Sequence, residues 1–133
     1  MNRLVTGVAA ALCLAMSVRG QAHHSFAAEY DRARTITVTG TVERLEWTNP
    51  QARLYVNGKD EAGKELLWDF ELGPPNGLMR NGWSRNSLQN GHKVTVNGFR
   101  SKTSTTVANA RTVTLADGRQ VFAGSSFDTG SGQ

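Results

Sequence analysis

Cysteine is nearly absent from this sequence, since the chain has a single one, Cys13. Residues 1–22 have the form of a secretory signal, with Arg3 ahead of an apolar run over residues 4–18 that is short for a membrane span. Small residues end this segment, and cleavage after Ala22 would remove the cysteine. We therefore expect a mature chain with no disulfide, no thiolate metal ligand and no cysteine nucleophile.

Clustered positive charge is also missing. Loss of Arg3 and Arg19 with the signal would lower Lys plus Arg from 15 to 13 against 11 acidic residues, a net charge of +2. The remaining basic residues are scattered along the sequence, whereas a nucleic-acid footprint has a clustered basic face. After residue 22 no apolar stretch approaches the roughly 20 residues of a spanning helix. These features predict a periplasmic protein without a transmembrane segment and without a nucleic-acid partner.

Catalytic motifs are scarce as well. The chain has three histidines, no glycine-flanked serine motif and no His-x-x-His pattern. The adjacent acids Asp60 and Glu61 fall in a predicted turn, where exposure to solvent explains them. We expect no enzymatic activity.

Alternation of apolar residues with threonine is what the sequence does have. Residues 35–42 alternate strictly, which is typical of a β-strand. The apolar positions then change from even numbers, ending at Val42, to odd numbers at Leu45 and Trp47. Such a phase change beside a glycine within a strand predicts a bulge or sharp bend near Gly40.

Further strands follow in a regular order. They are predicted over residues 52–57, 64–72, 92–99 and 107–115, with a short sixth strand over 120–122. One or two short helices are expected within residues 76–88, where Ser84 could cap a second turn. Three strands, a helical segment and two more strands is the order of an OB-type barrel. We therefore predict an all-β fold with one or two short helices: a small OB-like five-stranded barrel with a C-terminal hairpin extension. An open sandwich is the alternative.

The expected organisation has four parts. Residues 1–22 are the signal peptide, 23–34 an N-terminal arm, 35–123 the barrel domain and 124–133 a disordered Gly/Ser-rich tail. The arm is expected to be either extended or one turn of helix.

Several phrases of the sequence resemble, in combination, an uncharacterised family of small secreted bacterial proteins, a domain of unknown function. They are His23-His24-Ser25-Phe26, Gly40-Thr41-Val42, Glu46-Trp47-Thr48-Asn49-Pro50, Trp68 to Gly73, Asn76, Leu78, Arg80 to Trp83, Asn109-Ala110-Arg111, Leu115 and Asp117-Gly118-Arg119. The resemblance implies a periplasmic OB-like protein and brings no established activity. It also implies a histidine where Gln51 stands, which weakens any metal role of this chain.

Metal binding is a hypothesis that depends on the new N-terminus. Cleavage after Ala22 would leave His23 with a free amine, and an amine and imidazole on one residue can chelate copper(II), which heads the divalent affinity order. His24 could assist, and His92 is the remaining imidazole. The alternative is that His23 and His24 form an ordinary exposed end and that His92 is a surface turn residue.

A ligand-binding set is suggested near the predicted turns. It consists of two aromatics that could stack on a ligand and of polar residues around the two proline-containing turns: Trp47, Asn49, Glu71, Asn76, Arg80 and Trp83. The structural alternative is core packing of the aromatics, including Trp68, with Asn76 capping a helix and Glu71 paired with Arg80. The resulting hypothesis is an exported, non-catalytic binding protein of unknown small-molecule ligand. Copper handling through His23, or a structural role beside an envelope protein, are the alternatives.

Overall fold

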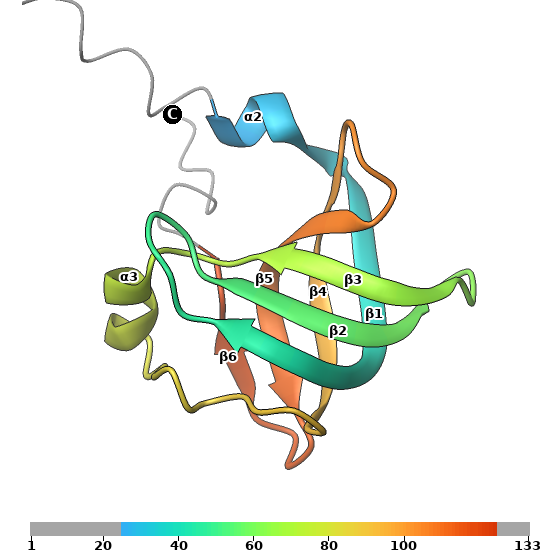
Figure 1. The fold of residues 1–133 in the computed structure, drawn as a ribbon. Coiled ribbons are helices and arrows are strands. Elements are labelled where there is room, and N and C mark those ends of the chain that lie inside the picture. Colours follow the sequence, from blue (N-terminus) through green and yellow to red (C-terminus); the bar gives the residue numbers. More distant parts are fainter. Residues whose placement is uncertain (1–24, 125–133) are drawn as a thin grey trace, which may run out of the picture.

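The computed structural model describes residues 25–124 and shows a mostly β fold with two short helices (Figure 1). The predicted signal, His23, His24 and residues 125–133 of the predicted tail lie outside this range. In chain order the elements are α2 (Ser25–Glu29), β1 (Tyr30–Glu46), β2 (Arg53–Asp60), β3 (Glu65–Glu71), α3 (Pro75–Arg80), β4 (Lys93–Ser101), β5 (Val107–Leu115) and β6 (Gln120–Phe122). Neither helix in this range has the length and hydrophobicity needed to cross a membrane.

The strands form a partly closed ring that agrees with the OB-type prediction. The sheet order is β3-β2-β1-β4-β5-β6, and β3 also pairs with β5. This last pairing is parallel and short, joining Asp69 to Val107, Phe70 to Ala108 and Glu71 to Asn109. Each of the first five strands therefore has two neighbours within the ring, and β6 extends the sheet as a hairpin with β5, which has a third neighbour in this way.

Strand β1 is the element that lets the sheet turn back on itself. Its first part pairs with β4 and its last part with β2, and both partners are antiparallel. The strand begins at Tyr30, so it includes residues 30–34 of the arm predicted over 23–34, and α2 includes residues 25–29. The bulge predicted near Gly40 is confirmed, since the register with β2 shifts between Val42 and Arg44.

Gly40 lies beside the bulge and has a role of its own. A Cβ on this residue would lie 2.1 Å from the carbonyl oxygen of Asn57 and 2.5 Å from the Cα of Gly58. The two glycines face each other in the β1–β2 register. Gly40 is therefore required by the close approach of two backbones, and the bulge forms three residues later.

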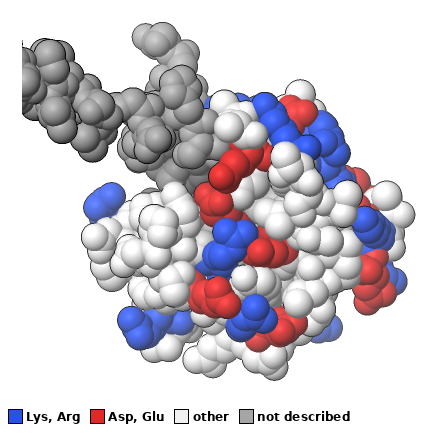
Figure 2. All heavy atoms as spheres, turned by 45° about the horizontal axis from the view of Figure 1, so that its top comes forward, with Lys and Arg blue, Asp and Glu red and all other residues white. Residues whose placement is uncertain are grey.

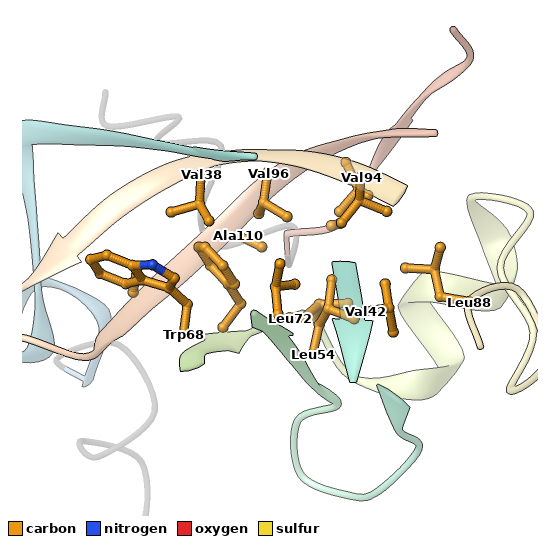
Figure 3. Packing of buried hydrophobic residues seen from close by; sticks show 14 of the residues in the cluster. Val38, Val42, Leu54, Trp68, Leu72, Leu88, Val94, Val96 and Ala110 are labelled. Carbon is orange, nitrogen blue, oxygen red and sulfur yellow. The ribbon is translucent and has the colours of Figure 1, made fainter. Parts of the chain in front are cut away.

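The core fills the inside of the ring (Figure 3). Alternate residues of each strand point inward, as the sequence pattern predicts, and Val38, Leu54, Phe70 and Val96 are fully buried. Trp68 is also buried, and its Nε1 donates a hydrogen bond to the Gly58 carbonyl at 3.1 Å. The prediction that Trp68 packs in the core is confirmed.

The connection between β3 and β4 covers one end of this core. Helix α3 starts after Pro74 and contributes buried Leu78, and the following irregular segment adds Trp83 and Leu88. Ser84 does not begin a second helix, because its hydroxyl and backbone bond to Asn86 and Ser87 within a turn.

The N-terminal helix is held against the ring by aromatic contacts. The Phe26 ring lies 5.4 Å from the Tyr30 ring and 6.1 Å, edge-on, from the Phe99 ring. The backbone of Lys102 donates to the Glu29 carbonyl at 2.8 Å. These contacts fix the end of α2 beside the sheet and so place Glu29 next to the β1–β2 connection.

Candidate functional site

A cleft of about 450 Å³ opens where α2, the β1–β2 connection and the ends of β2 and β3 meet. Its volume is within the range of small-molecule pockets. Polar side chains from segments far apart in the sequence dominate its lining, which consists of Glu29, Thr48, Asn49, Pro50, Gln51, Arg53 and Glu71. We call this the Gln51 cleft.

The β1–β2 connection forms one wall and is held by short-range hydrogen bonds. The Thr48 hydroxyl donates to the Gln51 carbonyl at 3.2 Å, and the peptide bond between Asn49 and Pro50 is cis. Ala52 exchanges backbone hydrogen bonds with the chain after β3, donating to Gly73 and accepting from Leu72. The turn is therefore tied to the end of β3, and the cleft wall has a defined position.

Arg53 and Glu71 face outward from adjacent strands and occupy paired positions. Arg53 Nε donates to Asp69 Oδ1 at 2.8 Å, and its Nη1 lies 3.8 Å from Glu71 Oε2. Burial would lower the pKa of Arg53, but the hydrogen bond and charge of Asp69 and the charge of Glu71 outweigh burial and raise it. The guanidinium thus has neighbouring carboxylates on both sides.

Tyr30 supplies a donor from behind the cleft. Its hydroxyl donates to Glu71 Oε2 at 2.7 Å. Burial raises the pKa of Tyr30, and the hydrogen bond and charge of Glu71 raise it further. The phenol therefore stays protonated at neutral pH and holds the Glu71 carboxylate in one position.

Gln51 carries the unsatisfied group of this cleft. Its side-chain Oε1 is buried, and no described residue donates a hydrogen bond to it. A buried acceptor without a donor costs about 1–3 kcal/mol. Gln51 lines the cleft, so a turn of its side-chain amide toward the cleft would bring this oxygen to a donor of a bound molecule.

The structure brings two of the six predicted ligand-binding residues, Asn49 and Glu71, to this cleft. Trp47 packs in part against the core. Trp83 is buried, and its Nε1 donates to the Phe122 carbonyl at 2.8 Å.

The other two predicted residues, Asn76 and Arg80, are exposed on α3. The expected capping by Asn76 is wrong, because the N-cap is Pro74 and no side chain bonds the helix start. Pro at this helix start lacks an N–H, which leaves one less donor in need of a cap.

His92 lies in the turn before β4, as the surface-turn interpretation predicted. Its Nδ1 accepts from the Gln89 backbone at 3.2 Å, and it lines an apolar groove of about 460 Å³ with Leu88 and Leu115. Within residues 25–124 no three histidine, cysteine or acidic side chains form a group suited to a metal ion. His23 and His24 fall outside that range.

Sequence reasoning missed Tyr30, Arg53 and Glu29 as residues of the cleft. The pairing of Arg53 with Glu71 had a usable signal, because a hairpin centred on residue 62, close to the predicted turn at Asp60 and Glu61, places the two in register. No sequence signal placed α2 beside the β1–β2 connection, since that contact depends on Phe26 packing over Phe99.

The fold and the cleft together define a small β-rich protein with a polar ligand-sized cleft at one end of a partly closed ring. More specifically, the chain belongs to a family of unknown function, DUF6152, which matches residues 10–109. This bears out the resemblance to an uncharacterised family. No curated protein and no solved structure matches the chain.

Proposed function

We propose that this protein is an exported, non-catalytic binding protein whose ligand occupies the Gln51 cleft. The size of the cleft and the convergence of polar side chains from α2, the β1–β2 connection and two strands support this function. Apolar residues fill the interior of the ring, so the polar cleft stands apart from the core.

The buried oxygen of Gln51 is the observation that carries this proposal. It requires a donor, and the carboxylates of Glu29 and Glu71 add acceptors around the same space. Arg53 is already engaged by Asp69. The cleft therefore favours a small polar molecule rich in N–H or O–H donors, such as an amine or a polyol.

Native mass spectrometry of the protein isolated from its own periplasm tests this function. We expect the chain to carry an added small-molecule mass, and the variant Gln51→Met to lose it. Asn76→Asp, an exposed change on α3, is the matched control and should keep the added mass. The bare chain mass in every sample, or an equal adduct on Gln51→Met, would contradict the proposal.

Copper handling is the alternative, and it is supported by the chelating chemistry of His23 after cleavage at Ala22. We expect weak to moderate binding of one copper(II) by the amine and ring of His23, with weaker binding of zinc. One residue added before His23 converts the amine to an amide and should abolish this binding in calorimetry. Equal affinity with and without that residue would remove His23 as the anchor.

A structural role beside an envelope protein is a third candidate. It predicts a second protein that stays bound during isolation, with no small-molecule mass. The native spectrum described above distinguishes this outcome from ligand binding.

A further inference from the structure

A second cleft, of about 230 Å³, lies at the other end of β3 and has a different chemistry. It is lined by Arg34, Lys64, Trp68, Arg100, Ser101, Lys102, Thr103, Ser104, Thr105 and Val107. We call it the cationic cleft. Four of its ten lining residues are Lys or Arg, four carry hydroxyls and none carries a carboxylate.

The four cations come from four separate segments of the chain. Arg34 is on β1, Lys64 is in the β2–β3 turn, Arg100 is on β4 and Lys102 is in the β4–β5 loop. Figure 2 shows several basic side chains at the upper right beside an acidic one, whereas acidic and basic side chains alternate across the centre of the face. The fold thus brings together basic residues that are far apart in the sequence.

Two of these cations are free to meet a ligand. Within residues 25–124 no hydrogen bond or ion pair is formed by the side chain of Arg34 or Lys64. Lys102 donates from Nζ to the Ala27 carbonyl. Arg34 and Lys64 thus add positive charge beside Trp68, and none of the lining residues is acidic, which favours an anion.

Arg100 is held in a fixed position by acids that lie outside the lining. Its Nη2 donates to Glu61 Oε1 at 2.6 Å and to Asp60 Oδ2 at 3.4 Å. A guanidinium has five N–H donors, so most of them remain available. Arg100 is therefore a preorganised donor whose charge is already balanced by these two carboxylates.

The loop hydroxyls add donors of the right kind. The Ser101 hydroxyl oxygen accepts from the backbone N–H groups of Thr103 and Ser104, and that of Ser104 accepts from Thr106. The Ser101 and Ser104 hydroxyls also lie 3.5 Å and 3.3 Å from those of Thr103 and Thr106, so in each pair one hydroxyl proton is used within the loop and the other can be donated. The backbone bonds occupy the N–H groups of Thr103, Ser104 and Thr106, so an anion here would be bound largely by side chains.

We propose that the cationic cleft binds a phosphate-type oxyanion through Arg34, Lys64 and Arg100, assisted by the Ser and Thr hydroxyls of residues 101–105. The volume suits such a group, because it lies below the range of about 300–1,000 Å³ of pockets for drug-sized ligands. The oxyanion is either a free phosphate compound or the phosphate of a lipid headgroup. This site is separate from the Gln51 cleft and does not depend on the function proposed there.

Calorimetry with inorganic pyrophosphate at low ionic strength, and flotation with vesicles of phosphatidylglycerol in phosphatidylcholine, test this site on the mature chain. The test variant is Arg34→Gln with Lys64→Gln. The control is Arg85→Gln with Lys93→Gln, which removes the same charge from exposed positions outside the cationic cleft. Circular dichroism checks that both variants fold.

Three outcomes are distinguished. Saturable pyrophosphate binding that weakens by about tenfold or more in the test variant alone supports the site with a free oxyanion as ligand. Binding to phosphatidylglycerol vesicles alone, absent with phosphatidylcholine and weakened only in the test variant, supports a lipid phosphate. The site is overturned if neither probe binds or if both variants lose affinity equally, since that would reflect net charge only.

Discussion

The two ends of strand β3 differ in what their surroundings offer a ligand. At its C-terminal end Glu71 lines a cleft in which the one cation, Arg53, is engaged by Asp69. At its N-terminal end Lys64 and Trp68 line a cleft without a lining carboxylate. The β2–β3 hairpin thus has hydrogen-bond acceptors at one end and cations at the other.

The shared element of the two clefts is the core beneath β3, so its disruption has the largest expected effect. Trp68→Ala removes a side chain that is 1% exposed, together with its hydrogen bond to Gly58. We expect the free energy of unfolding to fall by about 3–5 kcal/mol, measured by urea denaturation. Leu67→Ala, at an exposed neighbour, should cost far less. Equal losses for the two would mean that β3 does not anchor the ring as described.

Tyr30 forms its side-chain hydrogen bond beside the Gln51 cleft, at the C-terminal end of β3. Tyr30→Phe removes the donor to Glu71 and should lower the free energy of unfolding by about 1–2 kcal/mol at neutral pH. Because the folded state raises the pKa of Tyr30, this contribution is complete below the unfolded pKa of about 10 and is lost as pH rises above it. The difference between wild type and variant should therefore shrink above pH 10 or so in urea titrations. A difference that stays constant to high pH would exclude this hydrogen bond as its cause.

Substitution of Gln51 should change stability in the opposite direction and make the protein more stable. Gln51→Met replaces an unsatisfied buried oxygen by a side chain of similar shape, and we expect it to raise the free energy of unfolding by about 1 kcal/mol in the ligand-free protein. The measurement is thermal or urea unfolding after removal of bound small molecules. A loss of stability would show that the oxygen has a structural partner, which would weaken the proposed ligand role.

Asp60 is one of the two acids that bond to Arg100 beside the cationic cleft. Its substitution should have the smallest effect on stability of the changes considered. Hydrogen bonding from the Lys64 backbone is the main cause that lowers the pKa of Asp60, and Arg100 lowers it further against the opposing effect of burial. A lowered pKa stabilises the fold above the unfolded value, and that stability is lost as pH falls through the folded value. The urea midpoints of the wild type and of Asp60→Asn should therefore converge below about pH 4. Parallel curves down to pH 2 or so would contradict this linkage.

Local patterns predicted much of the fold. Alternation located the five main strands, and the strand order predicted the ring. Gly40 shows the limit, because the sequence marks a glycine but not whether it serves a bulge or a close approach to Gly58. That distinction depends on the partner strand.

The sites were harder to predict because their residues meet only in the folded chain. Asn49 and Glu71 were recognised from turn chemistry, and both line the Gln51 cleft. Arg34 and Lys64 looked like scattered surface charges, since nothing local relates a residue of β1 to the β2–β3 turn. Long-range contacts of this kind leave no periodic signal.

Backbone amide NMR tests most directly whether β3 carries two separate sites. Spectra of the isotope-labelled protein isolated from the periplasm would be compared before and after removal of its bound small molecule, and again on addition of pyrophosphate. We predict shifts around residues 48–53 and Glu71 in the first comparison, and around Lys64 and residues 100–107 in the second. Shifts in one common set of residues, or none in residues 48–53 on removal of the small molecule, would contradict the account.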